Sequence, residues 1–146
     1  MSGQDAHDLV AELWRRQPPV AHELGGDAPD ACVTSLRETL ATLAADAASL
    51  AGDRRRTDHS GARLLAETAR AIHDALGATL SAGPSGSRLD AVTPWADRLR
   101  FARMERWLAA RAEDDPSAEP SASLCLWVIE HLETSVPLPR RIIPPA

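Results

Sequence analysis

The sequence predicts an all-α protein, a single helical bundle of about five helices. Three observations lead to this class. Alanine, leucine, arginine and glutamate dominate the 146 residues and β-branched residues are few, so helix propensity is high almost throughout. Apolar residues recur at spacings of three and four, the period of one helix face. Proline and glycine gather in short segments that separate the periodic stretches.

The first predicted helix covers residues 4–16 and is ended by Pro18 and Pro19. Residues 17–29, which contain these prolines, form a connecting loop. The second begins at Asp30 as N-cap and ends at Gly52. Each carries an apolar stripe at helical spacing, the second in alternating steps of three and four that are typical of a bundle or coiled-coil seam. The stripes are Ala6, Leu9, Val10, Leu13 and Trp14 in the first, and Val33, Leu36, Leu40, Leu43, Ala47 and Leu50 in the second.

The second helix contains unusually few charges, since only Arg37, Glu38 and Asp46 are charged between residues 31 and 51. A helix with so little charge usually has neighbours on more than one side. Two explanations stay open: either this helix is central in the bundle, or one of its faces meets a second protein molecule. The second explanation predicts a homodimer through the helix at 31–51.

The remaining helices are predicted at 60–80, 94–112 and 121–134. The loop at 53–59 is short enough to make its flanking helices antiparallel neighbours, and Thr93 and Pro94 supply the start of the fourth helix. We expect an antiparallel four-helix core with the short N-terminal helix across one side, all within one domain at 1–135, followed by an extended proline-rich tail at 136–146. The inward residues are Leu65, Ala69, Ile72, Leu76 and Leu80 in the third helix, Phe101, Met104, Leu108 and Ala112 with Trp95, Leu99, Ala102 and Ala109 in the fourth, and Leu124, Cys125, Val128, Ile129 and Leu132 in the fifth.

Composition excludes several chemistries. The chain has no Lys, Tyr or Asn, so a P-loop or a Schiff-base enzyme is ruled out and all 16 basic residues are arginines. A net charge of −5 makes nucleic acid an unexpected partner. Cys32 and Cys125 fall in apolar helical patterns, which is typical of buried thiols. With neither an export signal nor a membrane-spanning run, the expectation is a cytoplasmic protein without membrane contact.

The sequence gives little support for catalysis. None of the five histidines has an acidic residue three positions before it or a His or Glu four positions after it, so neither a metal site nor a cofactor is expected. The segment 83–87 lacks the second glycine of a nucleophile elbow. Proton transfer near neutral pH would depend on scattered histidines, shifted carboxylates or a thiol. These observations favour binding over catalysis.

The fourth helix carries the most informative pattern. Arg100, Arg103, Trp107 and Arg111 follow at i, i+3, i+7 and i+11 and share one narrow arc. Trp and Arg are enriched at binding hot spots, and a guanidinium stacks on an indole and pairs with carboxylate or phosphate. The alternative is a solvated arginine face with Trp107 half covered by arginine stems. The pattern favours a non-catalytic, self-associating binding protein that recognises an acidic protein partner or a small anionic ligand.

Aromatic and imidazole groups suggest a second hypothesis, a small helical enzyme or small-molecule binder. Its pocket would lie between helices near Trp95, His73 and His131, and Trp127 is the i, i+4 neighbour of His131 on the less apolar side of the fifth helix. A second pair, with the i, i+7 spacing, lies on the first helix and consists of His7 and Trp14. For each histidine the alternative is an edge-of-core or surface position with a satisfied hydrogen bond.

A third hypothesis comes from a short motif. Arg54 and His59 form R-x4-H, which resembles the motif of the helical HEPN ribonucleases. The resemblance covers six residues in a predicted inter-helix loop and lacks the usual polar residue after the arginine. It implies ribonuclease chemistry at these two side chains, which would have to converge in one groove of a dimer.

Overall fold

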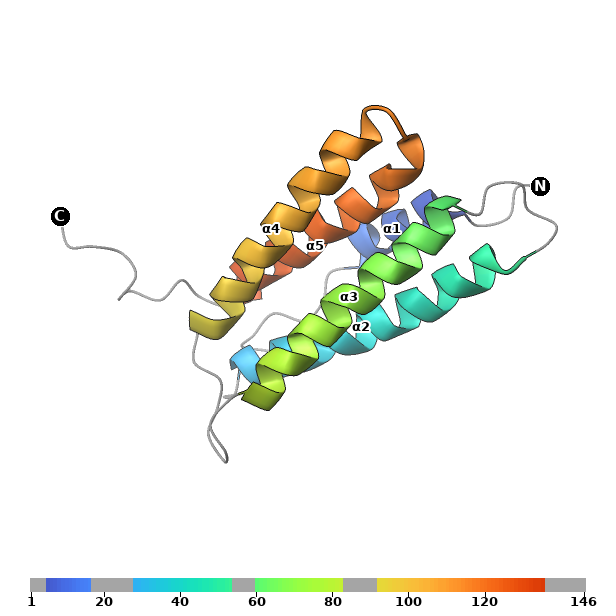
Figure 1. Ribbon diagram of the computed structural model, residues 1–146. Helices are drawn as coiled ribbons and strands as arrows, with labels where there is room; N and C mark the ends of the chain where they lie inside the picture. Colours follow the sequence, from blue (N-terminus) through green and yellow to red (C-terminus); the bar gives the residue numbers. More distant parts are fainter. Residues whose placement is uncertain (1–4, 17–27, 54–59, 83–91, 136–146) are drawn as a thin grey trace.

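The computed structural model describes the backbone of residues 5–16, 28–53, 60–82 and 92–135, and the side chains of 5–16, 33–53, 60–78 and 97–132 (Figure 1). Within these ranges every regular element is helical, which confirms the all-α class. A single turn of 3-10 helix, η2, joins the last two helices. The elements are α1 (Ala6–Arg15), α2 (Ala28–Ala51), α3 (Ser60–Ala82), α4 (Val92–Ala112), η2 (Pro116–Ala118) and α5 (Glu119–Ser135).

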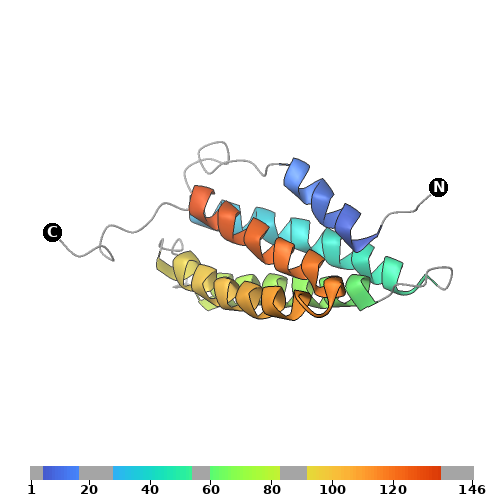
Figure 2. The ribbon, with the colours of Figure 1, turned by 90° about the horizontal axis from the view of Figure 1, so that it is seen from above.

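Two antiparallel hairpins make the bundle, α2 with α3 and α4 with α5 (Figure 1). Seen from above, α2 and α5 form one layer, α3 and α4 form the other, and α1 packs over α2 and α5 (Figure 2). This is the predicted four-helix core with the N-terminal helix across one side. Both α3 and α5 contact each of the other helices, so the centre of the bundle lies between them.

Three helices begin slightly earlier than predicted, and a proline explains each case. α2 begins at Ala28 rather than after Asp30, α4 at Val92 and α5 at Glu119. Each start lies one or two residues before a proline, at Pro29, Pro94 and Pro120. Proline is tolerated in the first turn because its missing N–H has no intrahelical acceptor there. Pro29 and Pro120, expected before their helices, therefore lie inside them, and Pro94, expected as the first residue of its helix, is preceded by Val92 and Thr93.

α1 begins at Ala6 behind a capping box and not at residue 4. Asp5 Oδ1 accepts from the backbone N–H of Asp8 at 2.9 Å, and Asp8 Oδ2 accepts from the N–H of Asp5 at 3.2 Å. This exchange satisfies two N–H groups that the helix would otherwise leave unpaired.

Two indole N–H groups fasten α1 to α5. Trp14 Nε1 donates to Ser123 Oγ at 2.9 Å, and Trp127 Nε1 donates to the carbonyl of Leu13 at 3.1 Å. The second bond is buried, so it is not exposed to competition from water. Because the two bonds run in opposite directions, they fix both the position and the rotation of α1 on the bundle.

Arg37 makes a polar contact between α2 and α3. Its Nε donates to the carbonyl of His73 at 3.2 Å, and its guanidinium lies against Gly77. A Cβ added at Gly77 would stand 2.8 Å from Arg37 Nη2, so the missing side chain makes room for the arginine. Arg37, one of the few charged residues of α2, therefore makes its polar contact within this chain.

Most residues of the predicted apolar stripes form the core, but Trp14 is 40% exposed. The stripe residues that are only half-buried at the edge of the core are Leu50, Ala102, Met104, Ala109, Ala112 and Ile129, and the side chains of Leu80 and Trp95 lie outside the described residues. Two further expectations were wrong. Trp127, placed on the less apolar side of its helix, is only 2% exposed, because α1 covers it. Leu99, assigned to an inward arc, is 59% exposed. Of the two explanations for the few charges of α2, the structure excludes the central position: α2 contacts α1, α3 and α5, but its outer residues Thr34, Ala41, Ala45 and Ala48 are exposed.

Candidate partner-binding face

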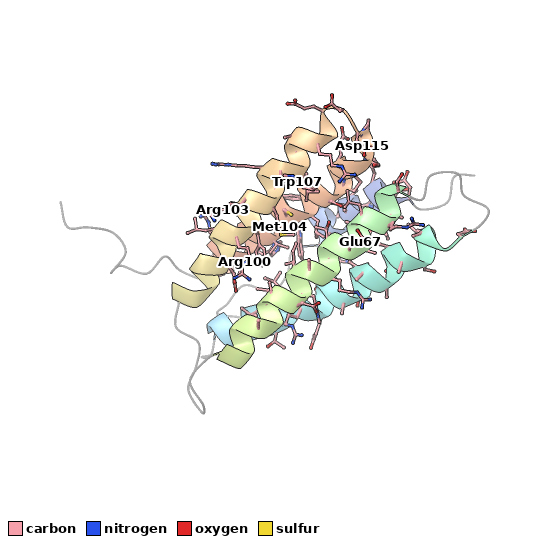
Figure 3. The ribbon with its side chains drawn as sticks, viewed as in Figure 1. Glu67, Arg100, Arg103, Met104, Trp107 and Asp115 are labelled. Atoms are coloured by element: carbon pink, nitrogen blue, oxygen red, sulfur yellow. The ribbon has the colours of Figure 1, made fainter. Side chains whose placement is uncertain are left out.

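The four residues predicted to share an arc of α4 all lie on the surface; we call Arg100, Arg103, Trp107 and Arg111 the Arg/Trp face (Figure 3). Trp107 is 61% exposed. The guanidinium carbon of Arg111 lies 5.5 Å from the centroid of the Trp107 ring, within the range of a cation–π contact. Arg111 thus covers part of the indole, and the rest of the ring is open to solvent.

Carboxylates compensate the arginines of this face only loosely. α4 carries five arginines and two carboxylates, whereas the whole chain has a net charge of −5. Arg100 Nη1 lies 3.9 Å from Oδ1 of the buried Asp97, and Arg111 Nε lies 3.7 Å from Asp115 Oδ2. Arg103 makes no ion pair with any residue that the structure describes, and it projects away from the bundle. At 3.9 and 3.7 Å, near the longest distance for an ion pair, these two carboxylates hold the guanidinium groups weakly, so the face keeps its capacity to bind an anion.

The Asp115 carboxylate forms hydrogen bonds within the turn that follows α4. It accepts from the hydroxyl of Ser117 at 2.6 Å and from the backbone N–H of Ser117 at 3.1 Å. These two hydrogen bonds, with a smaller contribution from the charge of Arg111, lower the pKa of the Asp115 carboxyl below its usual value. Asp115 therefore stays ionised and anchors η2.

Next to Trp107 lies a shallow apolar groove that the sequence did not predict, the α3/α4 groove. It has a volume of about 240 Å³, and its lining includes Met104, which Figure 3 shows on α4, and Glu67, which it shows on α3. Helical spacing within α4 identifies the arginines but carries no information on which residues of α3 stand opposite them. The lining residues are Leu64, Glu67, Thr68, Ala71, Met104, Trp107 and Leu108.

The expected His/Trp pocket is assembled only in part. Trp127 and His131 touch, with ring centroids 4.1 Å apart and an interplanar angle of 44°. His73 lies on α3, where its Nδ1 is 3.1 Å from Asp74 Oδ1. The side chain of Trp95 lies outside the described residues. Of the four candidate pocket residues, the structure thus brings Trp127 and His131 into contact, both on α5, whereas His73 contacts Asp74.

His131 is held as a neutral imidazole. Its Nδ1 lies 2.8 Å from the carbonyl oxygen of Trp127, and because a carbonyl only accepts, Nδ1 carries the proton. Burial lowers the pKa of His131 below its usual 6.5, against smaller opposing effects of the Trp127 carbonyl and Glu130.

This lowered pKa predicts a pH dependence of stability. Below pH 6.5 the unfolded chain takes up a proton at His131 that the folded chain resists, so the free energy of unfolding should fall as the pH decreases through 6.5. Urea unfolding between pH 7 and pH 5 measures this effect. In His131→Gln, which keeps an N–H donor, the dependence should be shallower; equal slopes in the two proteins would contradict the assignment.

The predicted pair of His7 and Trp14 lines a second groove, between α1 and α5, of about 520 Å³. His7 Nε2 stands 3.5 Å from Glu119 Oε2 at its edge, and both side chains are solvent-exposed. The other lining residues are Val10, Ala11, Pro120 and Ser123.

Cys125 is a buried free thiol. Burial, and secondarily the charge of Glu105, raises the pKa of Cys125 to about 12, so it is no nucleophile at neutral pH. The side chain of Cys32, and both Arg54 and His59 of the ribonuclease-like motif, lie outside the described residues.

In the part of the chain that the structure describes, no group of three or more His, Cys, Asp or Glu side chains is placed to hold a metal ion. None of the helices in that part has the length and apolar character needed to cross a membrane.

Comparison of the chain with protein-family models, with curated proteins and with solved structures gives no match.

Proposed function

We propose that this chain is a non-catalytic helical binding protein that recognises an acidic partner through the Arg/Trp face. The observation that carries the proposal is the exposed Trp107 ring among guanidinium groups, in a chain whose overall charge is negative. Trp and Arg are among the residue types enriched at binding hot spots, and an indole can stack on a guanidinium group of a contact surface.

The α3/α4 groove beside the Arg/Trp face indicates which side chains a partner would need, namely an apolar one together with carboxylates. An apolar side chain of the partner would cover Trp107 and enter the α3/α4 groove beside Met104. Carboxylates of the partner that lie toward the N-terminal end of α4 from that side chain would pair with Arg100 and Arg103, whose planar forks bind them bidentately. A small anionic ligand would use the same guanidinium groups without the groove. Such binding should weaken as salt increases.

The test measures the affinity of a labelled amphipathic peptide of alternating Glu and Leu positions by fluorescence anisotropy. Reversing two charges in Arg100→Glu/Arg103→Glu should weaken binding about tenfold or more, because attraction becomes repulsion at the rim of the contact. Arg15→Glu/Arg16→Glu changes the net charge equally on α1 and serves as the control. Equal affinities of the two variants would show that the face is not the binding site.

A second candidate is a small-molecule binder or small helical enzyme that uses the α1/α5 groove. The contact between His7 and Glu119 at the groove edge, with Trp14 in its wall, favours it. The expected dimer through α2 also stays a proposal. It is supported by the exposed outer face of α2, which Ala41, Ala45 and Ala48 keep small and uncharged.

A further inference from the structure

We infer that the acidic partner of the Arg/Trp face is the α1/α2 groove of a second copy of this chain, so that copies join head to tail. The α1/α2 groove is a hollow of about 420 Å³ between these two helices. This inference rests on the proposed function and names its partner. The charges of the groove, their spacing along α2 and the position of the two surfaces in the bundle support it.

The α1/α2 groove combines an apolar floor with acidic walls. Glu38 and Asp46 of α2 line it and are exposed, and neither makes an ion pair with any residue that the structure describes. The third carboxylate, Glu12, is held on α1 by Arg15 at 2.9 Å and by Arg16 at 3.7 Å. Two carboxylates beside apolar surface therefore stay available to a tryptophan bordered by arginines. The floor consists of the buried leucines Leu9, Leu13 and Leu43.

The charges of the two helices are opposite in sign and equal in spacing. On α4, Arg103 and Arg111 lie eight residues apart with Trp107 midway between them. On α2, Glu38 and Asp46 also lie eight residues apart. At 1.5 Å per residue, each pair spans about 12 Å. When Trp107 lies over the middle of the acidic pair, both arginines reach a carboxylate at once, and the leucine floor covers the indole.

The charges beyond these pairs select an antiparallel orientation of α4 on α2. α1 runs opposite to α2, so Arg16 at its C-terminal end lies toward the Glu38 end of the groove (Figure 2). Antiparallel docking sets Arg111 against Glu38 and brings the exposed Asp114, three residues further on, to Arg16. Parallel docking would bring Arg100 to Arg16 and so oppose two like charges.

The side of α2 next to the groove has room for a helix. Ala41, Thr42 and Ala45 lie between the two carboxylates along α2, and all three are exposed and uncharged. Short side chains at these positions let the backbone of a second helix approach. The few charges of α2 thus fit a helix that meets a second molecule.

The two surfaces lie on opposite sides of the bundle. α1 packs on the layer of α2 and α5, whereas the Arg/Trp face borders the α3/α4 groove on the other layer (Figure 2). One chain can therefore present its Arg/Trp face to one neighbour and its α1/α2 groove to another. A contact between two different surfaces builds open chains, or rings where the rotation closes. One helix on one groove is a small interface, so the assembly should be reversible and salt-sensitive.

Sedimentation velocity of the full chain over a range of concentrations tests the inference. The unaltered protein should grow beyond a dimer as its concentration rises, and less so at high salt. Arg103→Glu/Arg111→Glu and Glu38→Arg/Asp46→Arg should each weaken the association about tenfold or more. Combined in one chain, the four reversals should restore the association, because opposite charges then face each other again.

Two further variants separate the indole and the net charge from the specific pairs. Trp107→Ala keeps every charge and should also weaken the association, because nothing then fills the groove. Arg63→Glu/Arg70→Glu on α3 changes the net charge as much as Arg103→Glu/Arg111→Glu does. Because Arg63 and Arg70 are exposed and line neither groove, this variant should still associate. Circular dichroism checks that each variant keeps its helical content.

Several outcomes would overturn the inference. The pairing is wrong if the association survives the reversals on either helix, if the four reversals together do not restore it, or if assembly stops at a dimer. A chain that stays monomeric but binds the acidic peptide through Arg100 and Arg103 refutes the second-copy partner and leaves the proposed function standing. A chain that does neither refutes both.

Discussion

Replacing Trp127 with alanine should lower the free energy of unfolding by about 3–5 kcal/mol, the cost of truncating a large buried aromatic residue. Trp127 is 2% exposed, stacks on His131 and donates its indole N–H to the carbonyl of Leu13. The substitution therefore removes core volume and one of the two bonds that hold α1 on α5. Since domains of this size are stable by about 5–15 kcal/mol, urea unfolding should show a large shift of the midpoint.

Two further variants separate the contributions of Trp127. In Trp127→Phe the apolar ring is mostly kept and the hydrogen bond is lost, which should cost about 1 kcal/mol, since the Leu13 carbonyl still accepts from the N–H of Arg16. Trp107→Ala truncates the same residue type on the surface and should change stability by less than about 0.5 kcal/mol. Similar losses for Trp127→Ala and Trp107→Ala would contradict the difference in burial.

Replacing Phe101 with alanine should cost about 3–5 kcal/mol. Phe101 is fully buried and, with Leu108, attaches α4 to the rest of the core. Its removal leaves a cavity beneath the helix that carries the Arg/Trp face, so peptide binding should weaken along with stability. Chemical denaturation and the anisotropy assay measure the two effects.

Leu99→Ala is the matched control on the same helix. Leu99 lies two residues before Phe101 and is 59% exposed, so its truncation should change the free energy of unfolding by less than about 0.5 kcal/mol. If Leu99→Ala were as destabilising as Phe101→Ala, the rotation of α4 about its axis would be wrong. The residues assigned to the exposed Arg/Trp face would then be wrong as well.

Much of the fold could be predicted because helix formation depends on local sequence. The spacing of Leu65, Ala69, Ile72 and Leu76 predicted a buried stripe, and all four are fully buried. The helix starts were less accurate, because proline is compatible with the first turn as well as with the loop before it. The charge-poor stretch of α2 had two explanations, and the structure removed the one that made α2 central.

The Arg/Trp face was predicted in part. A regular helix fixes the angle between Arg100, Arg103, Trp107 and Arg111, so their common arc followed from spacing alone. The exposed fraction of Trp107 and the apolar groove beside it depend on how α3 packs against α4, which no periodicity within one helix contains.

The sequence by itself determined the all-α class, the helices and the arc of arginines around Trp107, because these depend on composition and on the period of a single helix. Tertiary structure alone decided which tryptophan is buried. Trp127 was expected on the less apolar side of α5 and lies in the core, since α1 packs over it and its Leu13 carbonyl accepts from the Trp127 N–H. Trp107, with the same side chain, stays exposed because none of the helices in the described part of the chain covers its side of α4.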